Sequence, residues 1–292
     1  MGASWNELRR VCQLPVRAGN DVAGLLFGDH ASLVITKVFV DLKLSPNYAS
    51  VGFLIAGLLG AGLQVGSGAC ALAGAVLLVL YYVLDCVDGE VARWQKVVNV
   101  HWGYFDYLFH MLIKPLAFFG VGLGCHLAGD STWPLIAAFA AAVSTLWRKI
   151  LIEIPGILFL KDVLRKGTAQ RPADAPASSS ATPAASTSAK GHEPFRLRAD
   201  LVTLRAILTN FDVGLLFLTV ASALDLAFDA PSFGPLGTHS FRALWLAYYG
   251  VLLPLDFLDY LVTYLRKRHF STEMTRLLSA AHDFRAEERE QR

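Results

Sequence analysis

Six long apolar stretches constrain what this chain can fold into more than any other feature of its sequence. Each is close to the ~20 residues with which an α-helix crosses a hydrocarbon layer about 30 Å thick. Each is also apolar around most of its circumference, which is typical of a helix in lipid and not of an amphipathic helix that faces water. The stretches are Tyr48 to Val65, Ala69 to Leu84 with the helix continuing to Arg93, Tyr104 to Leu127, Trp133 to Leu160, Leu208 to Phe228 and Phe241 to Leu265.

The overall composition agrees with a membrane protein. With 54% hydrophobic and 17% charged residues, the chain of 292 residues has too little polar surface to cover a soluble globule. The sequence therefore predicts an all-α, polytopic membrane protein with six transmembrane helices.

The distribution of Lys and Arg predicts which side of the membrane each connection occupies, because cytoplasmic loops carry an excess of these residues. Basic residues precede the first predicted span, lie between the second and third and between the fourth and fifth, and follow the sixth. The other connections contain no Lys or Arg: Gly66 to Gly68, Ala128 to Thr132 and Asp229 to Ser240. We therefore expect both termini, and the polar cluster described below, on the cytoplasmic side.

Charge and cysteine usage exclude some classes of partner and site. A net charge of +2 argues against a nucleic-acid partner, which would require a concentrated basic face, and leaves the basic residues as topology signals and contacts to membrane lipids. The first residues contain no short apolar run with a cleavage site, so no cleaved signal peptide is predicted. The cysteines lack paired spacing and indicate neither a disulfide framework nor a Cys-type metal site: Cys12, Cys70, Cys86 and Cys125.

The remaining sequence divides the chain into further segments. Within the cytoplasmic segment 1–47, Ala31 to Lys43 predicts a helix lying in the membrane interface, with an ordinary amphipathic surface helix as the alternative. Residues 166–196 form a predicted disordered cytoplasmic linker between helices 1–4 (48–165) and helices 5–6 (197–268), because Ala, Ser, Pro and Thr cannot bury enough apolar area. Residues 269–292 predict a cytoplasmic C-terminal helix or tail.

A cluster of ionisable residues interrupts the apolar pattern where the second span ends and the third begins. Such groups cost roughly 2.5–3.5 kcal/mol each at membrane depth, so a cluster of them is a candidate functional site. On a helix, residues that are three, four or seven positions apart share one face. Asp106 and His110 on the third span are four positions apart and therefore share a face. If the two helices are antiparallel, as their short connection indicates, three carboxylates and an imidazole converge. The members that share a face of the second span are Asp85, Asp88, Gly89 and Ala92.

This combination of side chains points to a divalent cation and to phosphate chemistry. Carboxylates that lie close together repel one another unless a cation lies between them. Oxygen ligands with one imidazole suit Mg²⁺ or Mn²⁺ better than Zn²⁺, and Mg²⁺ sites commonly include substrate phosphates. Gly89 and Ala92 let a bulky ligand approach, and Arg93 suits phosphate oxygens. Helix packing for the small residues and an orientation signal for Arg93 are the alternatives.

The spacing Asp85-x-x-Asp88-Gly89-x-x-Ala92-Arg93, followed by Asp106, resembles the signature of the CDP-alcohol phosphotransferase family, integral membrane enzymes of phospholipid and related synthesis. The family pattern is D-x-x-D-G-x-x-A-R, eight or nine residues, then G-x-x-x-D-x-x-x-D. The resemblance covers about Lys37 to Leu265 and includes Ser45-Pro46-Asn47, which is similar to the Pro-Asn that opens the family's first span.

Two positions depart from the family pattern. Trp102 stands where the second glycine is expected, with Gly103 one place late. His110 stands where the family has its fourth aspartate, a metal ligand proposed to act as general base. A neutral imidazole can bind a divalent metal, and its unperturbed pKa of ~6.5 suits a base near neutral pH. His110 is therefore a base, a metal ligand or the sign of a site that has lost activity.

The resemblance implies a reaction and a role for each residue of the pattern. An acceptor hydroxyl would attack the β-phosphorus of a CDP-linked alcohol and release CMP, with two Mg²⁺ or Mn²⁺ ions at the diphosphate. CDP-diacylglycerol is the favoured donor, a soluble CDP-alcohol is the alternative, and a homodimer is expected. A competing hypothesis is a non-catalytic cation-binding membrane protein, such as a pseudoenzyme, transporter or scaffold. The implied roles are metal binding by Asp85, Asp88, Asp106 and His110, catalysis by Asp106 and His110, and CDP binding by Asp85, Gly89, Ala92 and Arg93.

Three further basic residues within the apolar frame are candidate contacts for the acceptor: Lys114, Arg148 and Lys149. Lys114 lies four residues after His110, and pairing with an aspartate is its alternative role. Arg148 and Lys149 lie within the fourth span, where pairing with Glu153 is the alternative. Asp256 and Asp259 in the last span are expected to pair with Arg or Lys and not to bind metal.

Overall fold

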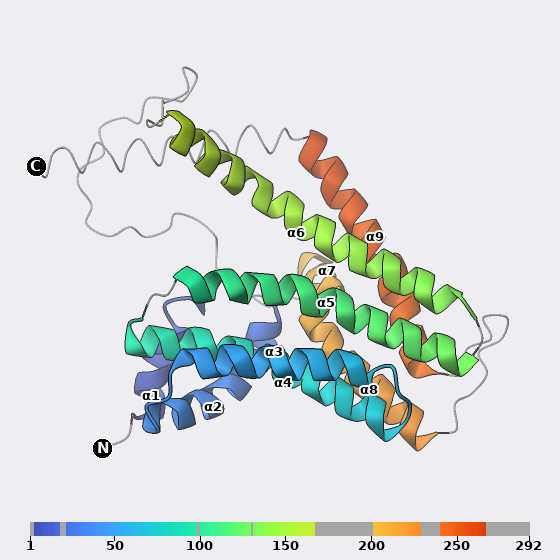
Figure 1. The fold of residues 1–292 in the computed structure, drawn as a ribbon, viewed down its shortest axis with the longest axis horizontal. Helices are drawn as coiled ribbons and strands as arrows, with labels where there is room; N and C mark the ends of the chain where they lie inside the picture. Colours follow the sequence, from blue (N-terminus) through green and yellow to red (C-terminus); the bar gives the residue numbers. More distant parts are fainter. Residues whose placement is uncertain are drawn as a thin grey trace, which may run out of the picture. The chain divides into compact units, whose positions relative to one another are not determined.

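The computed structural model describes residues 3–17, 22–97, 100–129, 131–166, 201–228 and 240–266 (Figure 1). It is 89% helical, and the described residues contain no strand, which confirms the all-α prediction. The elements are α1 Trp5–Leu8, η1 Arg9–Gln13, η3 Gly24–Gly28, α2 Asp29–Asp41, α3 Pro46–Leu63, α4 Ala69–Gln95, α5 Val100–Gly129, α6 Trp133–Lys166, α7 Leu201–Thr209, α8 Phe211–Ala227 and α9 Phe241–Arg266.

Five of these helices are long and apolar enough to cross a membrane, and the pair α7 and α8 supplies a sixth span if it is counted as one. This confirms an integral membrane protein built on long apolar helices. The uninterrupted helix expected from Leu208 to Phe228 differs from the structure, because the chain bends by 61° between α7 and α8. Asn210 lies at the bend, where its side chain accepts a hydrogen bond from the backbone N–H of Val213 and caps α8.

The chain divides into two compact units. The first comprises Met1–Val143 and Gly191–Leu253, and the second comprises Ser144–Lys190 and Pro254–Arg292. The predicted linker from residue 167 onward and the predicted C-terminal helix or tail lie outside the described residues. None of the four cysteines forms a disulfide.

Within the first unit, α3, α4 and α5 run side by side, and glycines bring their backbones into contact (Figure 1). A Cβ atom at Gly120 of α5 would collide with the backbone carbonyl of Ala61, and one at Gly124 would collide with that of Gln64. Between α3 and α4, a Cβ atom at Gly74 would lie only 2.8 Å from the carbonyl oxygen of Gly60. Only glycine permits these close approaches, so the axial position of each helix against its neighbours is closely defined.

The end of α3 where α4 begins is closed by a buried ion pair. The guanidinium of Arg242 lies 3.2 Å from the carboxylate of Asp225 and also donates to the backbone carbonyls of Gln64 and Gly66, at 2.9 and 3.0 Å. Asp225 accepts further hydrogen bonds from Ser240 and from the backbone N–H of Phe241. No local sequence pattern predicted this pair.

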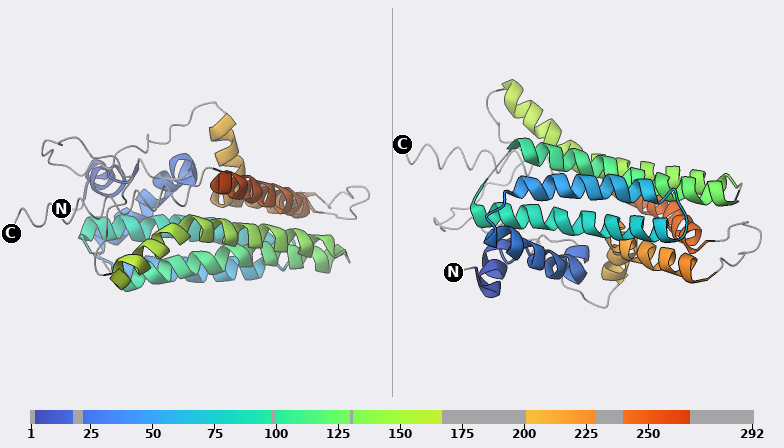
Figure 2. Two further views of the ribbon diagram at one scale, coloured as in Figure 1. Left: turned by 90° about the horizontal axis from the view of Figure 1, so that it is seen from above. Right: turned by 60° about the horizontal axis from the view of Figure 1, so that its bottom comes forward.

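The N-terminal segment packs against α4 through α2, η1 and η3, as the second view of Figure 2 also shows. The helix predicted from Ala31 to Lys43 is confirmed as α2, whereas the helical turns of α1 and η1 were not predicted. Val34 and Val38 on α2 are at least half exposed, while Ser32 and Thr36 on its other face are fully buried. Ile35 and Phe39 are also partly buried, packed against the apolar cluster of α3 and α4. Because α2 carries apolar side chains on its exposed side as well as on its packed side, this pattern favours the interfacial helix.

Candidate metal centre

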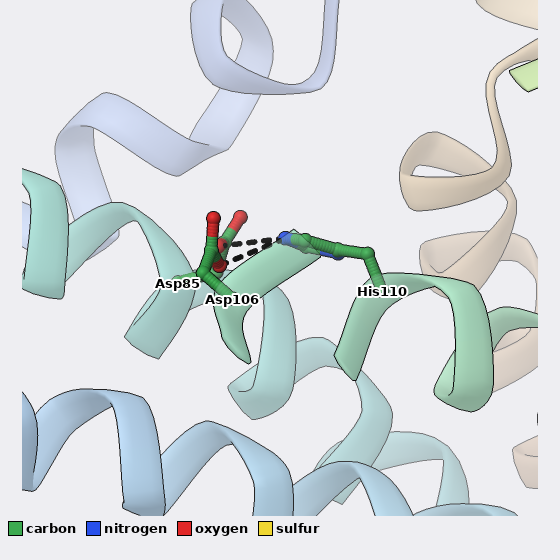
Figure 3. A group of neighbouring side chains, drawn as sticks. All are labelled: Asp85, Asp106 and His110. Atoms are coloured by element: carbon green, nitrogen blue, oxygen red, sulfur yellow. Dashed lines mark hydrogen bonds and ion pairs between the residues drawn. The ribbon is translucent and has the colours of Figure 1, made fainter. Parts of the chain in front are cut away.

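Three of the four predicted metal ligands come together in the first unit. Asp85 extends from α4, and Asp106 and His110 extend from α5, with both carboxylates facing the imidazole (Figure 3). His110 Nε2 lies 2.9 Å from Asp85 Oδ1 and 3.5 Å from Asp106 Oδ1. One ligand atom from each residue lies within 4.8 Å of the others. The predicted convergence of these two helices is therefore confirmed for these residues.

The way in which α4 ends explains why its face with Asp85 meets the face of α5 that carries Asp106 and His110. Lys96 adopts a left-handed backbone conformation, with φ of 54°, and its N–H bonds to the carbonyls of Ala92 and Arg93. This arrangement ends the helix directly after the motif. The short connection then returns the chain to α5, so that Asp106 and His110, one turn apart, face back toward Asp85.

The His110 ring is held on its other side by two buried aromatic residues. The hydroxyl of Tyr81 forms a hydrogen bond with His110 Nδ1, and the ring of Phe53 stacks on the imidazole at a centroid distance of 5.8 Å. Tyr81 and Phe53 are fully buried. A tyrosine hydroxyl can donate or accept, so Tyr81 can support either neutral tautomer of His110. One tautomer lets Nε2 donate to Asp85, and the other leaves Nε2 free to bind a cation or accept a proton.

The chemistry of this group fits a hard divalent cation. Asp106 Oδ1 is buried and has no hydrogen-bond partner among the described residues, since 3.5 Å to His110 is longer than an ordinary hydrogen bond. The side chains of Asp85 and His110 are about one fifth exposed, and that of Asp106 is 39% exposed, so an ion can reach them. Two carboxylates and an imidazole supply part of an octahedral shell, and Mg²⁺ commonly completes its shell with water or phosphate oxygens.

The fourth predicted ligand, Asp88, is not part of this group. Its carboxylate accepts a hydrogen bond of 2.8 Å from Ser50 Oγ on α3. The helical spacing correctly placed Asp88 near the face of Asp85, but it carried no information about Ser50. The structure therefore separates the predicted set into the triad Asp85, Asp106 and His110 and a carboxylate hydrogen-bonded to α3.

The predicted CDP-binding residues lie on the last turns of α4. Arg93 Nε donates to the backbone carbonyl of Cys12 at 2.6 Å. The Arg93 guanidinium lies over Gly89, because a Cβ atom at Gly89 would be 3.2 Å from Arg93 Nη1. Ala92 is partly exposed on the same turns. The absence of a side chain at Gly89 thus leaves room for Arg93, a contact that the spacing did not predict.

The three candidate acceptor contacts all have acidic partners. Lys114 Nζ lies 2.9 Å from the buried carboxylate of Asp212 and 5.2 Å from the centre of the Phe211 ring, in the first unit. In the second unit, Lys149 pairs with Glu153 at 3.5 Å, as the alternative interpretation expected. Arg148 instead pairs with Asp256 at 3.2 Å, which agrees with the expectation that Asp256 binds a basic residue. Acceptor binding by these residues stays a prediction.

One buried acidic residue of the motif helix was missed by the sequence analysis. Glu90 is 2% exposed, and its carboxylate accepts hydrogen bonds only from side chains of the N-terminal segment within the described residues: Gln13, Ser32 and Thr36. In the motif it occupies a position at which the family pattern allows any residue. A charged residue in such an apolar sequence was the available signal, but its partners are more than 50 residues away in the chain.

Comparison of the sequence with protein-family models and with curated protein sequences gave no match.

Proposed function

We propose that this chain is a membrane phosphotransferase that transfers a phospho-alcohol group from a CDP-linked donor to an acceptor hydroxyl and releases CMP. The observation that carries the proposal is the meeting of Asp85, Asp106 and His110 at the end of two membrane helices, with one carboxylate oxygen lacking a hydrogen bond. The resemblance of Asp85 to Arg93 to the CDP-alcohol phosphotransferase signature supplies the reaction. The favoured donor is CDP-diacylglycerol, which would transfer a phosphatidyl group.

Each residue near the triad has a role in this proposal. Asp85 and Asp106 would hold Mg²⁺ or Mn²⁺, and Asp88 stays a predicted ligand that would exchange its contact with Ser50 for the ion. When bound, the ion neutralises charge on the diphosphate oxygens and favours the departure of CMP. His110 Nε2, which faces the carboxylates, would accept the proton of the attacking hydroxyl or bind the ion. Tyr81 would keep the ring in that orientation.

The transfer itself breaks and forms one bond at the β-phosphorus. The acceptor oxygen bonds to this phosphorus, and the bond to the bridging oxygen breaks, so that CMP leaves with that oxygen. The hydroxyl proton passes to His110 when the imidazole acts as base. Arg93, which is permanently charged, would bind non-bridging oxygens of the diphosphate.

The direct test is CMP release by the purified protein. The protein is incubated with Mg²⁺ or Mn²⁺, candidate acceptor alcohols, and either CDP-diacylglycerol or soluble CDP-alcohols. CMP formed from CDP-diacylglycerol supports the phosphatidyltransferase, and CMP formed only from soluble donors supports the alternative donor class. If no donor yields CMP under any of these conditions, the proposed function is wrong.

The variant His110→Asp restores the family residue and tests what the histidine does. Activity retained in this variant supports a role as ligand or base, because aspartate can perform either. Activity that appears only in the variant would identify the natural chain as one that has lost catalysis. Aspartate is shorter than histidine, so the contact to Tyr81 is lost in either case.

A second candidate is a cation-binding membrane protein that catalyses no transfer. It is favoured by one observation: both His110 nitrogens have a partner, Tyr81 at Nδ1 and Asp85 at Nε2. It predicts binding of Mg²⁺ or Mn²⁺ that depends on Asp106, without CMP release from any donor. Metal binding measured by calorimetry alongside the CMP assay separates the two candidates.

The orientation and oligomeric state belong to the same proposal. The Lys and Arg distribution supports a site and termini on the cytoplasmic side. Labelling of an introduced surface cysteine with a membrane-impermeant maleimide, in sealed vesicles of known orientation, tests this placement. The homodimer implied by the resemblance is tested by the molecular mass of the protein in detergent.

A further inference from the structure

Glu90 is a buried carboxylate on the motif helix that the proposed reaction does not use. Successive residues are about 100° apart around an α-helix, so Glu90 lies roughly 140° from Asp85 and faces away from the triad. Its side chain is 2% exposed. Burying a carboxylate costs free energy unless hydrogen-bond donors satisfy it. The donors around Glu90 therefore indicate its role.

Among the described residues, all hydrogen bonds to the Glu90 carboxylate come from the N-terminal segment. Gln13 Nε2 and Ser32 Oγ donate to Glu90 Oε1 at 2.8 and 2.7 Å, and Thr36 Oγ1 donates to Oε2 at 2.5 Å. The three donors are almost completely buried. Gln13 also donates to the backbone carbonyl of Asp29 at 2.5 Å, which joins η1 to α2. Three buried side chains from this segment thus satisfy one buried carboxylate, so Glu90 holds these two elements against α4.

The residue before Gln13 makes the contact that reaches the candidate site. The carbonyl of Cys12 accepts the hydrogen bond from Arg93 Nε. Arg93 follows Glu90 by three residues, so the two side chains leave α4 on adjacent faces. With Nε bound to Cys12, the two terminal nitrogens of the guanidinium lie toward Gly89, the small residue of the motif. The direction of Arg93 therefore depends on a backbone carbonyl whose position is fixed by the neighbouring contact between Gln13 and Glu90.

The side chains of α2 agree with this arrangement. Ser32 and Thr36 are fully buried beside the partly buried Ile35 and Phe39, and the exposed face carries Val34 and Val38. A helix that buries hydroxyl groups and exposes apolar side chains needs a polar partner on the protein side and lipid on the other. Glu90 is that polar partner.

We infer that Glu90 is a positioning residue: it anchors the N-terminal segment on α4, and the anchored segment aims Arg93 at the diphosphate of the donor. The second half of this inference rests on the proposed function. The first half does not, because the docking of the segment can be measured without any reaction.

Cys12 provides a reporter for the docking. Its side chain is fully buried, and burial, followed by the charge of Glu90, raises the pKa of its thiol to about 11. The thiol of the docked segment is therefore protonated and inaccessible to maleimide near neutral pH. The experiment uses the full chain with Cys70, Cys86 and Cys125 replaced by serine, so that Cys12 is the remaining thiol.

In this background, Glu90→Ala is expected to increase the rate of Cys12 labelling about tenfold or more, because the segment opens locally. Glu90→Gln removes the same charge but keeps one acceptor oxygen, and it is expected to give an intermediate rate. Glu7→Gln, which removes an exposed carboxylate from the same segment, is the matched control and leaves labelling unchanged. If Glu90→Ala does not yield folded protein, Gln13→Ala tests the same contact from the other side.

The effect of the Arg93 orientation is measured in two ways. One is the binding of CDP in Mg²⁺ buffer, and the other is the kinetics of the donor in the CMP assay. Glu90→Ala is expected to weaken CDP binding and raise the KM for the donor about tenfold, with a smaller change in kcat. In an Arg93→Ala background the same substitution should add little, since both act through one contact. The control Glu7→Gln leaves these values unchanged.

The outcomes separate the inference from the proposed function. Unchanged Cys12 labelling in both Glu90→Ala and Gln13→Ala overturns the anchoring. Increased labelling with unchanged CDP binding, or full additivity with Arg93→Ala, overturns the aiming of Arg93. A third outcome is that Cys12 labelling increases in the Glu90 variants while the natural chain neither binds CDP nor releases CMP. That outcome supports the anchoring of the segment. It overturns both the proposed function and the orientation of Arg93 toward a diphosphate.

Discussion

Two of the groups of charged side chains in the first unit differ in how completely their hydrogen bonds are satisfied. At one end of α3, the pair Arg242 and Asp225 is buried, with side chains 4% and 8% exposed, and it makes hydrogen bonds to two backbone carbonyls and to Ser240. Near the end of α4 that is remote from this pair, Asp85 and Asp106 both face Nε2 of one imidazole, are partly exposed, and leave Asp106 Oδ1 without a hydrogen bond.

This difference separates a structural role from a functional one. Removing one member of a satisfied buried pair leaves its partner uncompensated, so such a pair resists change through stability. Two carboxylates that share a site repel each other, so the fold holds them together at a cost. The free-energy cost of holding the two carboxylates together is explained when they bind a ligand that the protein itself does not supply.

The largest expected effect is on the satisfied pair. Arg242→Met should lower the free energy of unfolding by about 3–5 kcal/mol, because the buried Asp225 loses its charged partner and two backbone carbonyls lose their donor. Unfolding of the purified protein in detergent, followed by circular dichroism, measures this loss. If the variant unfolds like the natural chain, the pair does not stabilise the fold, and the structural role assigned to it is wrong.

The opposite pattern is expected at the triad. Asp106→Asn should reduce CMP release by about two orders of magnitude or more, since it removes a proposed metal ligand with no change in size. Its stability should be unchanged or higher, because the repulsion of Asp85 is relieved. Asp41→Asn, in the exposed pair with Lys37, is the control for the loss of one carboxylate and should retain activity. Full turnover in Asp106→Asn would contradict the proposed site.

Removing the hydroxyl that holds His110 should have a smaller effect. Tyr81→Phe keeps the ring and its packing on Phe53 but deletes the hydrogen bond to Nδ1. Groups that orient a metal ligand typically contribute about 10- to 100-fold to metal affinity or activity. The Mg²⁺ dependence of CMP release measures the change. Tyr82→Phe, the same substitution one residue along, should leave that dependence unaltered, and an equal effect of both variants would argue against a specific role for Tyr81.

The smallest expected effect is the stabilisation of the natural chain by the metal alone. At a Mg²⁺ concentration ten times its Kd, binding to the folded state should stabilise it by about 1.4 kcal/mol. The midpoint of thermal unfolding should therefore rise with Mg²⁺ in the natural chain and not in Asp106→Asn. Arg242→Met should unfold earlier and still respond to Mg²⁺. A rise of equal size in Asp106→Asn would place the ion elsewhere.

The helices could be predicted from the sequence because hydropathy is a local property of each segment. The second span was expected from Ala69 to Arg93, and α4 runs from Ala69 to Gln95. The break at Asn210 was not predicted, because a single polar residue inside an apolar run reads as helix unless its capping bond to Val213 is known. Local pattern also brought Asp106 and His110 onto one face, which the structure confirms.

Partners distant in the chain could not be predicted in the same way. An aspartate partner for Lys114 was one open alternative, but nothing in the pattern identified Asp212, 98 residues away. Ser50 binds Asp88 across two helices, and Gln13 binds Glu90 from a segment without strong hydropathy. Helical spacing shows which side chains share a face, whereas the tertiary packing decides which side chain of another element meets them.

The glycine contacts between the helices have a consequence for how variants of this protein are interpreted. Gly120 lies ten residues beyond His110 on α5, which is about 15 Å along the helix, and touches none of the ligand atoms. A side chain at Gly120 would push α5 away from the carbonyl of Ala61, and a slide of one residue shifts His110 by about 1.5 Å past Asp85. The triad thus takes its alignment from a remote backbone contact, and a defect in catalysis can originate at a position with no chemistry of its own.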